Sequence, residues 1–225
     1  HVPQSQGARV ECSTICKTAF HIVSAQNNAP VMGCVQNTLV CMYIITETFT
    51  TPEETAEGYD LKSNYKFQGG NDGYMTMIDI SDFMDAMAIA KISPMRLQDL
   101  AHRAEIYYPD YVFKDESTGV KKFKSRIPGK IVASIVFPPT FTWSRKTDTN
   151  DKLPVVEIRD GIILPDSGPL CKKCIGGTAN SAIHPIWKIS PDTATRVISE
   201  LQFMTTVLIT RIGFSMGISD CIPTD

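Results

Sequence analysis

The chain has 225 residues, of which 43% are hydrophobic, and its formal net charge is -2. This length suffices for one large domain or two small ones with a sizeable core. The near-neutral charge excludes a bulk cationic field, so any contact with nucleic acid must be local or made by other chains. The first ten residues lack the features of a signal peptide. No apolar run reaches the about 18 residues that span a bilayer, so no contact with a membrane is expected.

The N-terminal part is expected to contain two helices separated by a polar loop. Ser5 is a good N-cap for a helix over residues 6–17. Apolar residues at spacings of three and four predict a second helix over residues 35–46. Between the helices, SAQNNAP at residues 24–30 is typical of a turn-rich loop.

The middle of the chain changes character. Residues 50–73 are polar and without periodicity, which predicts an exposed insertion with one short helix after Thr51-Pro52. Helical periodicity returns at residues 80–90, and Ser93-Pro94 is expected to start another helix. The following stretch, residues 107–126, is aromatic and then basic, which favours a hairpin or a loop.

The C-terminal part contains the clearest strand and helix signals. KIVASIVF at residues 130–137 predicts a strand that ends at a Pro-Pro pair. Asp160-Gly161 between two apolar runs predicts a hairpin over residues 155–164. A Ser-Pro start and a closing Gly213 bound a long helix over residues 192–212. Strands and helices alternate irregularly, so the predicted fold class is α+β, with mixed helices and short antiparallel hairpins.

Five stretches, in order, resemble the largest subunit of multisubunit, RNA polymerase II-like DNA-directed RNA polymerases. They are HVPQS (1–5), VSAQNNAPVMGCVQNTL (23–39), PGKIVASIVFP (128–138), DGIILPDSGPLCKKCIGG (160–177) and RIGFSMGISD (211–220). The second and last motifs, with the KK–G turn between them, are specific to that family. The stretch from residue 47 to 127 contains no such motif.

The resemblance implies a domain organisation and an activity. Residues 1–46 would be the C-terminal part of the active-site domain, residues 47–210 the pore domain with a divergent insertion near 50–75, and residues 211–225 the start of the funnel domain. This places the segment just after the loop whose aspartates bind catalytic magnesium. The polymerase is a nucleotidyltransferase, yet its catalytic residues and its Mg ligands are expected outside this chain. No catalytic or metal-binding residue is therefore expected within it.

The resemblance also implies partners and a location. The pore lines the secondary channel, which admits nucleoside triphosphates and a transcript-cleavage factor. Expected partners are therefore the rest of the largest subunit, the other polymerase subunits, the DNA template and the RNA transcript. An intracellular location follows, in the nucleus, or in a viral factory or virion for a viral enzyme. The odd count of seven cysteines agrees, because it argues against a secreted disulfide framework.

Five residues are predicted to contact nucleotide or RNA in the channel. Lys172, Lys173 and Gly176 match a KKTVG turn of the family, and two ammonium groups would attract phosphate without reading sequence. Gln26 and Asn27 carry amides that suit sugar and phosphate contacts. The alternatives are a solvated lysine turn and a polar loop bonded to itself.

The sequence departs from the family pattern at several positions. Asn37 stands where the family has Asp, Cys174 where it has Thr, Ala29 where it has Lys and Ser219 where it has Gly. These departures favour a divergent polymerase, of the kind found in large DNA viruses, over a standard cellular one.

The sequence also bears on two other classes of function. Cys171-x-x-Cys174 is half of a zinc ribbon, which would make the chain an independent thiol- or zinc-binding module. A structural zinc site needs two further ligands, which Cys12, Cys16 or His184 would have to supply. A hydrolytic enzyme is disfavoured, because no nucleophile–base pair or phosphate-binding loop is visible.

Overall fold

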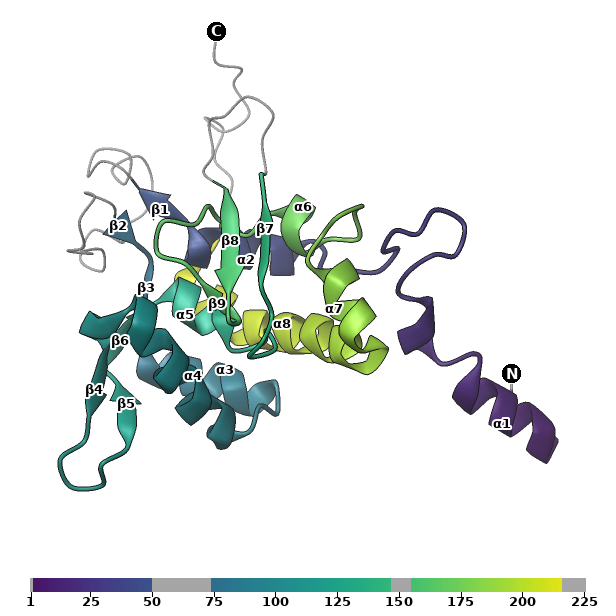
Figure 1. The fold of residues 1–225 in the computed structure, drawn as a ribbon, viewed down its shortest axis with the longest axis horizontal. Coiled ribbons are helices and arrows are strands. Elements are labelled where there is room, and N and C mark those ends of the chain that lie inside the picture. Colours follow the sequence, from purple (N-terminus) through teal and green to yellow (C-terminus); the bar gives the residue numbers. More distant parts are fainter. Residues whose placement is uncertain (1, 50–73, 147–154, 216–225) are drawn as a thin grey trace, which may run out of the picture.

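The computed structural model describes residues 2–49, 74–146 and 155–215. Its long helix α8 (Pro191–Ile212) lies across the middle of the body, where α2, α3 and α7 contact it (Figure 1). Short antiparallel sheets lie beside these helices. The predicted α+β class is therefore confirmed. No helix within the described ranges is both long enough and apolar enough to cross a bilayer.

The elements are short apart from α4 and α8. Besides α8, the α-helices described are α1 (Gln6–Thr14), α2 (Asn37–Thr46), α3 (Ile80–Ile89), α4 (Pro94–Tyr107), α5 (Gly129–Ser134), α6 (Lys172–Ile175) and α7 (Ile183–Ile189). The 3-10 helices are η1 (Thr18–His21) and η3 (Pro109–Tyr111). The strands are β1 (Thr48–Phe49), β2 (Tyr74–Met75), β3 (Met77–Asp79), β4 (Val112–Lys114), β5 (Lys121–Phe123), β6 (Arg126–Pro128), β7 (Trp143–Arg145), β8 (Val156–Arg159) and β9 (Ile162–Ile163).

Helix α8 organises the core, and the helix predicted over residues 192–212 is confirmed. Its N-cap Ser190 accepts a hydrogen bond from the Thr193 N–H (3.4 Å). The helix ends at Ile212, and its C-cap is Gly213, whose φ of 76° suits a residue without a Cβ. One face is buried against the other helices, namely Ala194, Val197, Leu201, Met204, Thr205 and Leu208.

The strand predicted at residues 130–137 is wrong. Residues 129–134 form helix α5, in which the Ser134 hydroxyl donates to the Lys130 carbonyl one turn back (2.6 Å). Every residue from 127 to 138 is buried, so no polar face marks the helical period. Gly129 allows the close approach of α5 to α2, since a Cβ there would lie 2.1 Å from the Ile45 carbonyl oxygen.

The predicted hairpins are confirmed. Strands β8 and β9 pair antiparallel around Asp160 (φ 50°) and Gly161 (φ 69°), as a type I′ turn requires. Strand β7 pairs with the other edge of β8. Strands β4 and β5 form the hairpin expected within residues 107–126. The short helix predicted after Thr51-Pro52 lies outside the described residues.

Residues 2–21 form an N-terminal arm, of which α1 projects from the body while η1, at its base, contacts α8 (Figure 1). Helix α1 confirms the first predicted helix, and the Ser5 hydroxyl caps it by accepting from the Ala8 N–H (3.1 Å). No residue of α1 is buried. The predicted second helix is confirmed as α2, which lies in the core against α5 and α8.

Candidate functional site

Two of the sequence motifs interlock through their backbones. A Cβ on Gly33 would lie 2.4 Å from the carbonyl carbon of Gly176 and 2.4 Å from the nitrogen of Gly177. The Cys34 N–H donates to the Ile175 carbonyl (2.9 Å). A side chain at residue 33 would therefore force the two loops apart. The VMG motif (residues 31–33) and the lysine turn (residues 171–177) are distant in sequence, yet they form one rigid unit.

The lysine turn folds as the short helix α6. Lys172 and Lys173 are exposed, whereas Cys174 and Ile175 point into the core. The Gly176 N–H closes the turn by donating to the Lys172 carbonyl (2.9 Å), and a Cβ on Gly176 would lie 2.5 Å from that oxygen. Gly176 is therefore required by the turn itself, while the two lysines face solvent.

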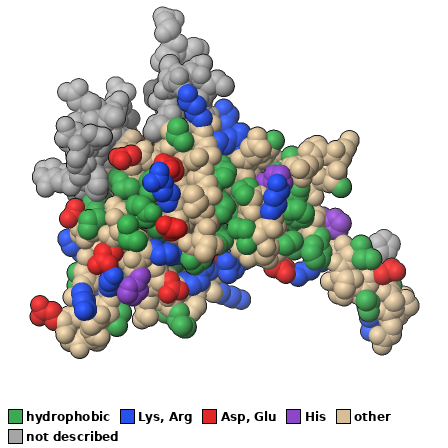
Figure 2. Space-filling view, in the orientation of Figure 1, with side chains coloured by type: hydrophobic (Ala, Val, Ile, Leu, Met, Phe, Trp, Pro, Cys, Tyr) green, Lys and Arg blue, Asp and Glu red, His purple; other side chains and the backbone are tan. Residues whose placement is uncertain are grey.

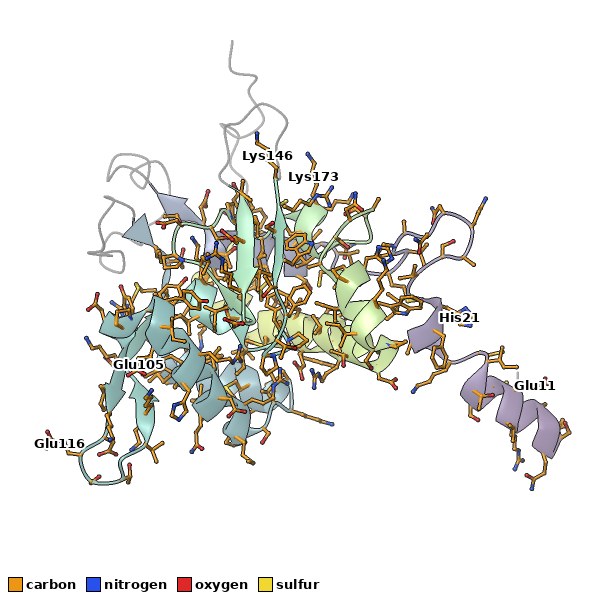
Figure 3. The ribbon with its side chains drawn as sticks, viewed as in Figure 1. Glu11, His21, Glu105, Glu116, Lys146 and Lys173 are labelled. Atoms are coloured by element: carbon orange, nitrogen blue, oxygen red, sulfur yellow. The ribbon has the colours of Figure 1, made fainter. Side chains whose placement is uncertain are left out.

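Strand β7 supports this turn from one side. The Arg145 Nη1 donates to the carbonyls of Lys173 (2.6 Å) and Ala179 (2.9 Å). Lys146 follows directly, and Lys146 and Lys173 both point outward from the upper edge of the molecule (Figure 3). We call Arg145, Lys146, Lys172 and Lys173 the basic rim. Figure 2 shows Lys and Arg side chains gathered on this edge.

The loop with Gln26 and Asn27 is closed by a bridge between Val23 and Pro30. The Asn27 Oδ1 accepts from the Ala29 N–H (3.2 Å), so this side chain stabilises its own turn. Both amide side chains are exposed. Because Pro30 leads straight into the VMG motif, the loop starts from the same rigid unit as the lysine turn. The loop with Gln26 and Asn27 and the lysine turn, both predicted to contact nucleotide or RNA, are thus connected through this backbone unit.

Cys171 and Cys174 are brought together, with their sulfur atoms 3.6 Å apart. A hydrogen bond from the Cys174 thiol lowers the pKa of Cys171 to about 6, and the N–H groups of Lys173 and Cys174 add to this effect. The same hydrogen bond, together with burial, raises the pKa of Cys174. Across the described ranges, no three His, Cys, Asp or Glu side chains gather as a metal site would require.

Comparisons with known proteins identify the family. The family described as "RNA polymerase Rpb1, domain 3" matches residues 21–221. The chain belongs to this family. Two relatives are DNA-directed RNA polymerase II subunits RPB1-A and RPB1-B of Trypanosoma brucei brucei, each 26% identical over 223 residues. The alignment covers 99% of this chain and 10% of each relative, so the chain spans about a tenth of their length.

The predicted resemblance is thereby confirmed, and the chain is a segment of the largest RNA polymerase subunit. The match also runs through residues 47–127, where the sequence contains no family motif. The alternative of an independent thiol- or zinc-binding module receives no support from these relatives.

One residue that positions this Rpb1-like site was missed from the sequence. Lys130 is 1% exposed, and its Nζ donates to the Thr48 hydroxyl and to the carbonyls of Pro165 and Ser167, each at 2.6 Å. Burial lowers the pKa of Lys130 to about 7. These bonds fix the segment that leads into α6. The sequence does contain a signal for this role, namely a lysine at the start of an otherwise apolar run. The prediction of a strand for that run gave no reason to expect the lysine to be buried.

Proposed function

We propose that this segment forms part of the wall of the secondary channel behind the active centre of a DNA-directed RNA polymerase. In this assignment residues 1–46 complete the active-site domain, residues 47–210 form the pore domain and residues 211–225 begin the funnel. The basic rim, held on a rigid backbone unit, is the observation that carries the proposal. In this proposal the basic rim supports DNA-templated RNA synthesis by contacting the phosphates of nucleotides or of the transcript 3′ end.

The chemistry of the rim suits phosphate and not base recognition. Exposed ammonium groups attract phosphate oxygens through charge, without regard to the base attached to them. The backbone that carries them is held in place, because the Lys173 carbonyl is held by Arg145 and the turn is packed against Gly33. Little conformational freedom of the backbone would be lost on binding, which favours contact with a passing ligand.

The N-terminal arm supports a place within a larger subunit. Val10, Ile15 and Phe20 expose between 46% and 68% of their surface. Val31, the first residue of the VMG motif, and Val35, two residues after it, are 59% and 55% exposed. Such a series of exposed apolar side chains is typical of a surface that other parts of an assembly cover. The rest of the largest subunit is the expected cover.

The remaining requirements of synthesis lie elsewhere in the enzyme. Magnesium, bound by residues outside this chain, would supply the phosphoryl-transfer chemistry. The other subunits, the DNA template, the RNA transcript, nucleoside triphosphates and a transcript-cleavage factor are the proposed partners. The same role implies a nuclear location for a cellular polymerase and a viral factory for a viral one.

The test is a double substitution, Lys172→Ala with Lys173→Ala, in the assembled polymerase. At low salt we expect the KM for nucleotides to rise, or the lifetime of the backtracked state to fall, by about fivefold. Two exposed charge contacts can account for a change of this size. The difference should shrink as salt is raised. Wild-type elongation and transcript cleavage at low salt would contradict the proposal.

The chain offers a matched control for this experiment. Lys121 and Lys122 form a second Lys-Lys pair, on β5, and they make ion pairs with Glu105 and Asp115. Lys121→Ala with Lys122→Ala removes the same charge from the enzyme at a different place. This variant should keep the nucleotide dependence of the wild type.

A further inference from the structure

The lysine turn contains a second chemical feature that the family assignment does not explain. Cys171 precedes the two lysines and Cys174 follows them, and their sulfur atoms lie 3.6 Å apart. The family motif that this turn resembles has Thr at the position of Cys174. Cys171 is half-buried, whereas Cys174 is fully buried. The Cys171 thiol is thus accessible to a reagent, and the Cys174 thiol lies next to it on the buried side.

Other cysteines in the described parts of the chain lack this arrangement. Cys34 and Cys41 are buried in the core, and burial raises the pKa of each to about 12, which keeps them as unreactive thiols. Cys12 and Cys16 are exposed on the N-terminal arm. By contrast, Cys171 combines partial exposure with a nearby sulfur and a cationic neighbourhood that includes Lys173.

We propose that Cys171 and Cys174 form a reversible disulfide, which makes this turn a dithiol–disulfide modification site. The sulfur atoms need to approach by about 1.5 Å to reach the bond length of a disulfide. The backbone already holds the turn closed, since the Cys174 and Ile175 N–H groups both donate to the Cys171 carbonyl (2.9 and 3.2 Å). Side-chain rotation is therefore the main movement required.

The oxidant is a small-molecule disulfide, for which oxidised glutathione is the probe. The Cys171 thiolate attacks one glutathione sulfur, the glutathione disulfide bond breaks, and one glutathione thiolate leaves. Cys174 then loses its proton to solvent and attacks the Cys171 sulfur, which releases the second glutathione thiolate. The protein loses two electrons and two protons, and the oxidant becomes two molecules of reduced glutathione.

This site encloses the residues of the basic rim. Lys172 and Lys173 are the two residues inside the ring that the disulfide would close, so oxidation fixes the backbone from which both ammonium groups extend. Any effect on phosphate contact rests on the proposed function. The disulfide itself does not, because its formation depends only on the two thiols and an oxidant.

The test uses the assembled polymerase in glutathione buffers of rising oxidised fraction. After the free thiols are alkylated, cleavage before aspartates yields one peptide, residues 166–191, whose two cysteines are Cys171 and Cys174. We expect this peptide to lose two hydrogens in oxidising buffer and to regain them with dithiothreitol. Cys174→Ser should instead trap a glutathione adduct on Cys171. Cys12→Ser with Cys16→Ser is the control and should leave bridging unchanged.

Two results would overturn the inference. One is a wild-type peptide that stays fully alkylated, or stops at a stable glutathione adduct, in buffers that oxidise ordinary dithiols. The other is bridging of Cys174 to another cysteine in Cys171→Ser. Both are read by mass alone. If the lysine substitutions leave nucleotide use unchanged while bridging is intact, the channel proposal fails and this one stands.

Discussion

Arg96 and Glu200 form an ion pair between α4 and α8, with Nη1 and Oε1 2.5 Å apart. The Arg96 Nη2 also donates to the Ile135 carbonyl (2.5 Å), so one guanidinium joins three parts of the core. The Glu200 side chain is only 8% exposed, and its second carboxylate oxygen has no hydrogen-bond partner among the described residues. The pair thus joins α4 to α8 and to the residue that caps α5.

Arg96→Ala is expected to destabilise the chain by about 3 kcal/mol, because it takes the nearest cation away from a buried carboxylate. Urea denaturation, followed by circular dichroism, measures this loss. Arg196→Ala is the matched control, since Arg196 contacts the same carboxylate at 3.8 Å from an exposed position. The control should cost less than about 0.5 kcal/mol, and equal losses would refute the account.

Two glycine substitutions should act in opposite directions. Gly129→Ala would bring a Cβ within 2.1 Å of the Ile45 carbonyl and should cost about 3 kcal/mol through forced separation of α5 and α2. Gly7 lies in α1, where a Cβ would meet nothing closer than 4.0 Å. Gly7→Ala should therefore favour the helix, by up to about 1 kcal/mol. Thermal unfolding and helix content by circular dichroism check both. A tolerated Gly129→Ala would show that α5 moves freely.

Lys130 should make stability depend on pH in an unusual direction. Its folded pKa of about 7 lies below the ordinary 10.5. Between these values the unfolded chain binds more protons than the folded chain, so stability rises with pH. Below pH 7 both states are protonated, and the cost of burying the charge is fully present.

Lys130→Met should make this rise shallower, and urea unfolding between pH 7 and pH 8.5 measures the difference in slope. Cys171, whose pKa is lowered to about 6, adds a rise of its own in this window to both proteins. That window ends below the ordinary thiol pKa of 9.0, above which Cys34 and Cys41 would lower stability as pH rises. Lys130→Met should also lose stability overall, because the Pro165 and Ser167 carbonyls lose their donor. The same slope in both proteins would contradict this assignment.

Alkylation of Cys171 should follow a titration with its midpoint near pH 6, because the pKa of this thiol is lowered to about 6. At pH 7 the gain in thiolate, reduced by the weaker nucleophilicity of an acidic thiol, leaves a rate about fourfold above that of a thiol at its ordinary pKa of 9.0. Iodoacetamide labelling read by mass spectrometry checks this. Cys174→Ala removes the principal hydrogen-bond donor, so the midpoint should move up. An unmoved midpoint would assign the shift to the backbone and Lys173.

Local signals in the sequence predicted the parts of the fold that local chemistry decides. Ser190 with Pro191 began α8, and Asp160-Gly161 made the turn expected between β8 and β9. The apolar run at residues 130–137 failed because burial on all sides removes the periodicity that separates a helix from a strand.

The residues of the candidate site also fall into a group that the sequence predicts and a group that it does not. Motif resemblance identified Lys172, Lys173 and Gly176, whose placement on one turn is a local matter. The contact of Gly33 with Gly176 and the burial of Lys130 depend on how distant segments pack. Periodicity and spacing contain no information on such packing. Contact of Gln26, Asn27 and the lysines with nucleotide or RNA remains a prediction.

The interlock of Gly33 with Gly176 also bears on how the chain reaches its native state. The VMG motif cannot form this contact until residue 177 has been synthesised. The contact then closes a loop of 143 residues. The entropy cost of closing so long a loop grows only with the logarithm of its length. The 24 residues from 50 to 73 therefore add about 0.2 kcal/mol to that closure. Evolution can lengthen the sequence at this point with almost no thermodynamic penalty to the unit that displays the lysines.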